Sequence, residues 1–246
     1  MAEILMPALE RALQRIMSGA GLDLRRHRPE TSEAGRLSSM LTTHGVDVVL
    51  DVGANTGQFA QSLRKAGYKG QLVSFEPLST AHAQLLRASQ GDTRWEIAPR
   101  AAIGDHEGEI EMHIAGNSVS SSALEMLDRH AKAAPGSAYV GNERTRLTRL
   151  DTMARDYLQS GTVPFLKIDT QGYEDRVLDG ATDVLDRISG LQLELSFVPL
   201  YEGQKLFDAL VERLHAQGFS IWAIWPGFYD PRSGRMLQVD ATFFRD

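Results

Sequence analysis

A glycine-containing turn in the first quarter of the sequence is the clearest candidate for binding chemistry. The segment Asp51-Val-Gly-Ala-Asn-Thr-Gly57 follows an apolar run, where we expect a strand to lead into a helix. Glycine lets the backbone approach a ligand closely at such a turn, and Asp51 and Asn55 add polar groups at the carboxyl end of the strand. A pyrophosphate site would favour G-x-G-x-x-G, which the sequence lacks after Gly53. The spacing Gly53-x-x-x-Gly57 instead suits an adenosyl ligand without a phosphate.

An acidic residue closes the next apolar run and supports the same interpretation. Glu76, within Phe75-Glu76-Pro77, follows Asp51 by 25 residues. A carboxylate at this position can accept hydrogen bonds from both hydroxyls of a ribose, which makes a bidentate, charge-assisted pair. We therefore predict that Glu76 holds the ribose of the cofactor.

A third polar segment, Leu166-Lys-Ile-Asp169-Thr-Gln-Gly-Tyr-Glu174, predicts the reaction centre. Asp169 ends an apolar strand at the carboxyl edge of the sheet, where its carboxylate can act as a general base or as a metal ligand. It can also cap the helix that begins near Glu174. Glu194 ends the neighbouring strand and can reach the same space. We predict Asp169 as the catalytic base, assisted by Glu194 or by a histidine, and regard both carboxylates as candidate ligands of Mg²⁺.

The candidate site residues can meet only if the strands that carry them end at the same edge of a sheet. The pattern of apolar residues predicts such strands. Short β-branched runs are typical of parallel strands that are covered on both faces. The alternation of strands with helices is typical of a doubly wound α/β sheet, in which a late strand after a short loop can be antiparallel. The sequence predicts strands at 46–52, 72–75, 95–98, 163–169, 191–195, 219–224 and 236–244, and helices at 56–66, 80–88, 174–187 and 204–216.

The chain divides into a short N-terminal part and one larger domain. Apolar residues at helical spacing predict an amphipathic helix over 3–17, which packs on the domain or on a partner. The Arg-rich stretch 25–29 is either a solvated connector or a contact with an anionic substrate or membrane surface. We expect residues 1–37 to form this helix and connector, and residues 38–246 to form the domain. Within the domain, residues 108–150 are interpreted as inserted loops and a hairpin that act as a lid over the acceptor.

Composition excludes several classes of protein. Of the 246 residues, 42% are apolar and 24% are charged, which is typical of a globular domain rather than a disordered or fibrous chain. The formal net charge of −6 argues against a nucleic-acid partner, because phosphate binding usually requires a basic surplus. The absence of cysteine excludes disulfides and thiolate zinc sites and fits a reducing cytoplasm. No apolar stretch approaches the roughly 20 residues that span a bilayer, and the N-terminus does not resemble a secretory signal, so we expect a cytoplasmic protein.

Taken together, the motifs resemble those of the FkbM-type S-adenosylmethionine-dependent methyltransferases. The resemblance rests on the order and spacing of the four motifs at 51–57, 75–77, 150–151 and 166–174. It extends over residues 38–246. One departure is Thr170-Gln171, where the family commonly has an apolar residue followed by Glu. Losing that carboxylate weakens any assignment of a metal-binding or base role to position 171.

The resemblance implies a Rossmann-like class I methyltransferase fold, with a seven-stranded, mostly parallel sheet and an antiparallel last strand. It implies S-adenosylmethionine as methyl donor and a hydroxyl oxygen as acceptor, commonly that of a sugar in a glycolipid or antibiotic, or that of a polyketide. Glu76 would hold the ribose, Ala102 and the turn to Asp105 would flank the adenine, and Asp169 would face the reaction centre. The residues carried over to the methionine and ribose side are Asp51, Gly53, Asn55 and Gly57.

Substrate contacts are expected from the insertion and from the C-terminal loops. Serines of the expected lid either hydrogen-bond acceptor hydroxyls or form a flexible polar loop, and aromatic residues either offer a flat face to a sugar ring or pack as anchors. The C-terminal polar residues lie in a stretch that looks like one branch of the family. The substrate-binding candidates are Ser120, Ser121, Tyr201, Phe228, Gln238 and Asp240.

We therefore predict an S-adenosylmethionine-dependent O-methyltransferase that acts on a hydroxyl of a sugar in a glycolipid or other glycosylated metabolite. A polyketide-type acceptor and a non-catalytic adenosyl-binding regulator are the alternatives, while the missing G-x-G-x-x-G argues against a nicotinamide-dependent oxidoreductase. The N-terminal helix is suited to homodimerisation or to peripheral contact with the inner membrane surface, and equally to capping the domain.

Overall fold

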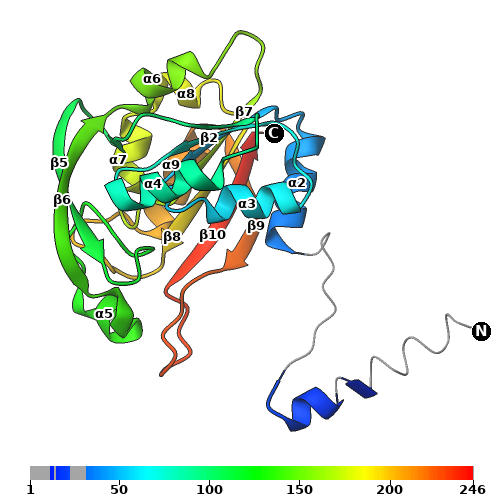
Figure 1. Cartoon of the computed structure of the whole chain (residues 1–246), viewed down its shortest axis with the longest axis vertical. Helices are drawn as coiled ribbons and strands as arrows, with labels where there is room; N and C mark the ends of the chain where they lie inside the picture. Colours follow the sequence, from blue (N-terminus) through cyan, green and yellow to red (C-terminus); the bar gives the residue numbers. More distant parts are fainter. Residues whose placement is uncertain (1–11, 14, 23–31, 246) are drawn as a thin grey trace, which may run out of the picture.

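A seven-stranded sheet forms the centre of the structure (Figure 1). The computed structural model describes residues 12, 13, 15–22 and 32–245. The strands lie in the order β3-β2-β1-β7-β8-β10-β9, and the pairs are parallel except those of β10, which is antiparallel to both β8 and β9. The predicted doubly wound sheet with an antiparallel last strand is confirmed. The strands are β1 (Val48–Val52), β2 (Gln71–Phe75), β3 (Trp95–Ile97), β7 (Pro164–Ile168), β8 (Gly190–Ser196), β9 (Phe219–Pro226) and β10 (Gln238–Arg245).

Helices cover both faces of this sheet, which explains why its strands are apolar on both sides. All five residues of β1 are buried, and they alternate between two cores. Val49 belongs to the core beneath α2, α3 and α4, which lie along one face (Figure 1), whereas Leu50 belongs to the core beneath α6 to α9. The helices are α2 (Glu33–Thr43), α3 (Gln58–Lys65), α4 (Ser79–Ala88), α6 (Leu150–Met153), α7 (Glu174–Asp179), α8 (Thr182–Leu185) and α9 (Phe207–Ala216).

Helix α2 is an element that the sequence analysis did not predict. Its start is fixed by Ser32, whose hydroxyl accepts a hydrogen bond from the backbone N–H of Gly35 at 3.1 Å. Leu37 and Leu41, one turn apart, are 1% and 0% exposed and pack in the core with Phe165 of β7. Burying each of these leucines stabilises the fold by about 2 kcal/mol. The described domain therefore begins several residues before the predicted boundary at 38.

The helix predicted over 174–187 is divided in the structure into α7 and α8, which Gly180 separates. Gly180 packs against the backbone of Gly104, where an added Cβ would lie 1.8 Å from the carbonyl oxygen. The Asp151 carboxylate accepts two backbone N–H hydrogen bonds of 3.0 Å from the first turn of α8 and so caps that helix. The Leu150-Asp151 motif is thus a structural junction between α6 and α8.

Residues 108–150 contribute to a second, three-stranded sheet with the order β4-β6-β5 at the side of the molecule (Figure 1). Its strands β5 and β6 are antiparallel, and a long connection with one short helix joins them. Met112 and Leu147 pack this sheet onto Leu78 at the start of α4. The elements are β4 (Ala102–Ile103), β5 (Gly108–Ala115), α5 (Asp128–Ala133) and β6 (Tyr139–Thr148), with 3₁₀ turns at Pro135–Ser137 and Ala154–Asp156.

The N-terminal prediction falls only partly within the described residues. Residues 12, 13 and 15–19 are helical, and the side chains of Leu13 and Ile16 are exposed. Residues 3–11 and 14 of the predicted helix, and the Arg-rich stretch 25–29, lie outside the described residues. The roles of this helix in dimerisation or membrane contact stay predictions. No helix in the described part of the chain combines the length and apolar character that a membrane span requires.

Candidate active site

A pocket of about 350 Å³ opens at the carboxyl ends of the central strands. It lies where the strand order reverses between β1 and β7, which is the point at which doubly wound sheets bind ligands. One wall comes from the turn after β1 and the end of β2, and the opposite wall from β7, β8 and β10. The smaller sheet contributes Ala102, Ile103 and Met112, and the connection after β5 contributes Ser121.

The turn after β1 is shaped by residues with positive φ. Gly53 has a φ of 81°, and an added Cβ would lie 1.8 Å from the carbonyl oxygen of Asp169. Asn55 has a φ of 47° and donates its backbone N–H to a Glu76 carboxylate oxygen, Oε2, at 2.8 Å. Gly57 has a φ of 92° and would collide with the ring of Trp95 if it carried a side chain. Glycine is thus required at two places of the motif, by conformation and by space.

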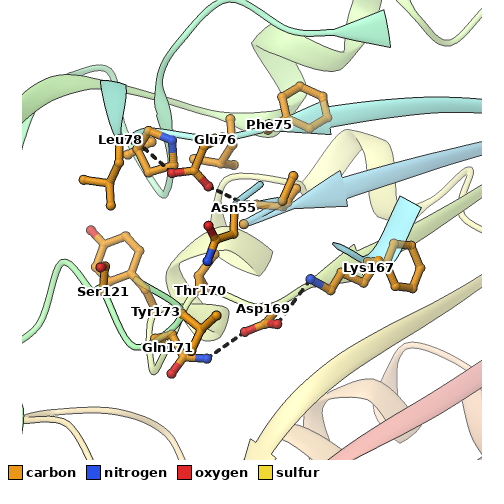
Figure 2. Close-up of a pocket in the computed structure, with 18 of the residues that line it drawn as sticks. Asn55, Phe75, Glu76, Leu78, Ser121, Lys167, Asp169, Thr170, Gln171 and Tyr173 are labelled. Atoms are coloured by element: carbon orange, nitrogen blue, oxygen red, sulfur yellow. Dashed lines mark hydrogen bonds and ion pairs between the residues drawn. The ribbon is translucent and has the colours of Figure 1, made fainter. Parts of the chain in front are cut away.

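Glu76 is the buried carboxylate of the first wall. It is 4% exposed, and its Oε1 accepts a hydrogen bond from the backbone N–H of Leu78 at 2.9 Å, while Oε2 accepts from Asn55 (Figure 2). Burial raises the pKa of Glu76 to about 7, although both backbone hydrogen bonds lower it. Each carboxylate oxygen can accept more than one hydrogen bond, so Glu76 can still receive two ligand hydroxyls.

The far end of this wall is apolar. Leu78, Ala102, Ile103 and Tyr173 line the pocket there, which suits the flat face of a purine ring. Asp105, predicted beside the adenine, does not line the pocket. Its carboxylate accepts hydrogen bonds from Arg176 at 3.2 Å, and its other oxygen lies 2.6 Å from the ring of its neighbour His106.

The second wall carries a buried cation between two carboxylates. Lys167 of β7 is 7% exposed, and its Nζ lies 3.4 Å from Asp51 Oδ1 and 3.3 Å from Asp169 Oδ2. Asp51 and Lys167 are register partners on β1 and β7, and the hydroxyl of Ser74 on β2 donates to Asp51 at 3.2 Å. Burial lowers the pKa of Lys167, but the surrounding carboxylates of Asp169, Asp51 and Asp240 more than offset this and raise it. Lys167 is therefore a permanent ammonium group at the pocket wall.

Asp169 is connected to Glu194 through an amide. The side-chain Nε2 of Gln171 donates to Asp169 Oδ1 at 2.7 Å (Figure 2) and to Glu194 Oε2 at 2.8 Å. Glu194 Oε2 also accepts from Gln238 Nε2 at 2.7 Å. Burial, followed by the charges of Asp169 and Asp240, raises the pKa of Glu194. Asp169 lines the pocket with a side chain that is 34% exposed, whereas Glu194 lies behind it.

Three further polar residues complete the end of the pocket beyond Lys167. The carboxylate of Glu33, from α2, accepts a hydrogen bond from Gln192 of β8 at 2.9 Å. Asp240 of β10 lines the same region, and burial followed by the charge of Asp169 raises its pKa to about 7. The sequence analysis missed Glu33, Gln192 and a site role for Lys167. Gln192 and Lys167 could have been found by the period-two spacing with Glu194 and Asp169, but no signal marked Glu33.

The predicted site residues divide into two groups. The pocket lining includes Gly53, Asn55, Glu76, Ala102, Ser121, Asp169 and Asp240. The other group lies behind or beside the lining and consists of Asp51, Gly57, Asp105, Ser120, Glu194, Tyr201, Phe228 and Gln238.

Two aromatic residues and one serine among the substrate-binding candidates lie outside the pocket lining. Tyr201 is 0% exposed, and its hydroxyl donates to Gln171 Oε1 at 2.8 Å, so it is a buried loop anchor and offers no free face to a sugar ring. Phe228 packs in the same core cluster, 5.2 Å from the ring of His130. The hydroxyl of Ser120 accepts a hydrogen bond from Asn117 at 3.0 Å.

Comparison with known proteins identifies the family of this chain. The family model described as Methyltransferase FkbM domain matches residues 51–221. The chain is also 27% identical over 174 residues to the 2-O-methyltransferase NoeI of Sinorhizobium fredii (strain NBRC 101917 / NGR234), which covers 68% of this chain and 70% of that protein. The match to the family model defines an S-adenosylmethionine-dependent methyltransferase. The chain belongs to the FkbM methyltransferase family.

Two methyltransferases are among the solved structures that the chain resembles at low sequence identity. The magnesium protoporphyrin IX methyltransferase of Synechocystis PCC 6803, solved with bound S-adenosylmethionine, has a TM-score of 0.46 and 12% identity, covering 89% of this chain and 80% of that one. An rRNA methylase from Streptococcus thermophilus has a TM-score of 0.46 and 14% identity, covering 90% of this chain and 99% of that one.

The described residues form no evident metal-binding site. Within the part of the chain that the structure describes, no group of three or more His, Asp or Glu side chains is arranged to hold one. The expectation that Asp169 and Glu194 bind Mg²⁺ therefore gains no support.

Proposed function

We propose that this chain is an O-methyltransferase that transfers the methyl group of S-adenosylmethionine to a hydroxyl of a sugar in a glycolipid or another glycosylated metabolite. The observation that carries the proposal is the position of Asp169. Its carboxylate lines the pocket between the Gly53 turn and Glu76 on one side and the polar end at Glu33 and Asp240 on the other. The similar protein of Sinorhizobium fredii is named a 2-O-methyltransferase, which supports oxygen as the atom that is methylated.

The first wall fits the nucleoside part of the donor. Glu76 would accept the ribose hydroxyls, and the apolar end at Leu78, Ala102 and Tyr173 would cover the adenine. The buried side-chain oxygen Oδ1 of Asn55 has no hydrogen-bond partner among the described residues, so it is suited to accept one from the amino group of the methionine part. Gly57 and Asp51 would act indirectly, by shaping the turn and by holding Lys167.

The second wall fits a reaction between a cationic donor and a hydroxyl. When bound, S-adenosylmethionine supplies an electrophilic methyl group on a sulfonium. Asp169 would accept the proton of the attacking hydroxyl, because a protonated sugar hydroxyl is a weak nucleophile. Lys167 and Gln171 each hold one oxygen of Asp169, which fixes the direction of the carboxylate. Holding the two reactants in line would supply much of the remaining rate.

The polar end of the pocket favours an acceptor with several hydroxyls. The carboxylates of Glu33 and Asp240 can accept hydrogen bonds, and Gln192 Oε1 is buried without a partner among the described residues. Such acceptors pair with the hydroxyls of a sugar, whereas a largely apolar polyketide would leave them unpaired at a cost of about 1–3 kcal/mol each. Glu33 and Asp240 are therefore proposed as acceptor contacts.

Calorimetric titration followed by a transfer assay tests this function. We expect micromolar binding of S-adenosylmethionine and S-adenosylhomocysteine, and transfer of radiolabelled methyl to aryl glycosides or glycolipid extracts in preference to hydroxylated polyketides. Donor binding without transfer to any acceptor would favour an adenosyl-binding regulator. Binding of a reduced nicotinamide cofactor in place of the adenosyl donor would contradict the proposal altogether.

A further inference from the structure

The turn that carries Gln171 is held from several sides. Gln171 has a φ of 55°, a conformation that costs a non-glycine residue energy, and Gly172 follows with a φ of 96°. The backbone carbonyl of Gln171 accepts a 2.7 Å hydrogen bond from the buried hydroxyl of Ser122. Glu174 Oε1 accepts the backbone N–H groups of Thr170 and Gly172 at 3.0 and 3.1 Å. The direction in which the Gln171 side chain leaves the backbone is therefore fixed.

The side-chain amide of Gln171 is also fully engaged. Its two N–H groups go to Asp169 at 2.7 Å and Glu194 at 2.8 Å, and its oxygen accepts the Tyr201 hydroxyl at 2.8 Å. A rotated amide would place its oxygen against two carboxylates, and the Tyr201 hydroxyl, which also donates to the Ser120 carbonyl at 3.3 Å, would lose its acceptor on Gln171. The observed orientation is thus the one in which both carboxylates receive an N–H group from the amide.

We infer that the Gln171 amide occupies the place between Asp169 and Glu194 that a bridging divalent cation would need, so that Gln171 is a metal-replacing positioning residue. A hard cation requires several oxygen ligands directed at one point. Here the group between the two carboxylates is a nitrogen that donates to both. Lys167 pairs with the other oxygen of Asp169, and Gln238 donates a second hydrogen bond to Glu194, so both carboxylates have partners without a metal.

This arrangement gives Gln171 a function that an apolar residue of similar size could not supply. Gln171 hydrogen-bonds one oxygen of Asp169 while Lys167 hydrogen-bonds the other, so the orientation of the carboxylate is fixed without a metal ion. A glutamate at position 171 would replace the bridging N–H groups by a third carboxylate facing Asp169 and Glu194. Mutual repulsion would then destabilise the site until a cation entered it.

The test is whether one substitution creates a metal site. Wild-type protein, free of any affinity tag, is titrated with Mn²⁺ by calorimetry and by electron paramagnetic resonance, alongside Gln171→Glu. We expect no binding by the wild type below about 1 mM, and binding by Gln171→Glu at least about tenfold tighter, in the range of weak oxygen-ligand sites. The melting temperature of Gln171→Glu should rise when Mn²⁺ is added, whereas that of the wild type should not.

Two further variants distinguish a cation that bridges the carboxylates from an effect of the added negative charge alone. Gln58→Glu places the same new charge on the rim of the same pocket, away from the pair, and should gain no Mn²⁺ binding. The double variant Gln171→Glu with Glu194→Gln should lose the gained binding. These measurements need no acceptor, so their failure is distinct from a failure of the proposed methyl transfer.

Two outcomes would overturn the inference. One is Mn²⁺ binding by the wild type that Asp169→Asn abolishes, because the cation position would then be open already. The other is a Gln171→Glu protein that gains no Mn²⁺ affinity. If that variant folds only in the presence of Mn²⁺, the inference is supported; if Mn²⁺ does not restore its folding, the inference is rejected.

Discussion

The Cα of Gly53 faces the carbonyl oxygen of Asp169 so closely that a Cβ at position 53 would lie 1.8 Å from that oxygen. The contact joins the turn after β1 to the turn after β7, and the Asp169 N–H donates to the Val52 carbonyl at 3.0 Å beside it. The turn proposed to bind the donor and the proposed base are therefore parts of one rigid junction. Moving either turn would move the other.

Replacing Gly53 by alanine should break this junction. The new Cβ would meet backbone, which cannot rotate away, and φ is 81°. We expect the free energy of unfolding to fall by about 3 kcal/mol or more, because backbone strain and overpacking act together. In a chain of this size that lowers Tm by about 6–12 °C. Gly91→Ala is the matched control, because Gly91 has a φ of 87° with no atom within 4 Å of an added Cβ. Equal losses in the two variants would show that the contact does not matter.

Replacing Glu76 by glutamine should weaken donor binding. The lost charge-assisted hydrogen bonds correspond to a fall in S-adenosylmethionine affinity of about 10- to 100-fold. Because the pKa of Glu76 is about 7, wild-type affinity should rise between pH 6 and pH 8 as the carboxyl ionises. Calorimetry at each pH measures the affinities of the wild type and the variant. Because the ligand titrates equally in both measurements, its own titration cancels in the ratio of the two affinities. Glu96→Gln, at an exposed glutamate of β3, should leave affinity unchanged. A pH-independent ratio would argue against ribose binding by Glu76.

Replacing Asp169 by asparagine should separate chemistry from binding. Loss of a general base lowers turnover by about 10²- to 10⁴-fold. Affinity for S-adenosylmethionine should change little, because the Asp169 backbone that supports the Gly53 turn is retained. Kinetics with saturating donor, together with calorimetry, distinguishes the two effects. Asp156→Asn, at an exposed aspartate, is the control. Turnover near that of the wild type would rule out Asp169 as the base.

Stability should fall as the pH rises through the neutral range. Glu76, Glu174 and Asp240 have folded-state pKa values of about 7, above the ordinary values of 4.5 for Glu and 3.8 for Asp. The folded protein therefore holds these protons more tightly than the unfolded chain, and the stability that this supplies at low pH is lost as pH rises through about 7. For each such group, the free energy of unfolding falls by about 2 kcal/mol as the pH rises from 5.5 to 8. That corresponds to about 4–8 °C in Tm.

Thermal unfolding across this pH range checks the prediction. Asp240→Asn should flatten the slope by removing one of the three groups, whereas Asp156→Asn should not alter it. A Tm that rises steadily from pH 5.5 to pH 8 would contradict the assignment of protonated carboxyls to the folded state.

Much of the donor side of the site could be predicted from the sequence, because its signals are local. The Gly53 turn and Glu76 each follow a buried strand directly, and parallel strands bring their carboxyl ends together. Whether a residue near such an end faces the pocket was less predictable. Asp51 lies two residues before Gly53, yet its side chain is buried against Lys167 rather than in the lining.

The acceptor side was less predictable because its residues come from elements far apart in the chain. Glu33 and Gln192 are joined across 159 residues, and nothing local marks Glu33. For Tyr201 the sequence left open a platform for a sugar ring and a packed loop anchor, and its buried hydroxyl donates to Gln171. The departure at Gln171 was visible in the sequence, whereas two of its three side-chain hydrogen bonds depend on Glu194 and Tyr201, which lie 23 and 30 residues away in the chain.

The place of β10 in the sheet has a consequence for how the protein is made. This strand is synthesised after the other strands of its sheet, yet it lies between β8 and β9 and supplies Asp240 to the pocket. Until it has been synthesised, β8 and β9 have no partner between them, and each presents unpaired backbone groups that can pair with another chain. A nascent chain would therefore acquire its acceptor end only after β10 has left the ribosome, and a transcript that stops before β10 would yield an aggregation-prone fragment rather than a partly active enzyme.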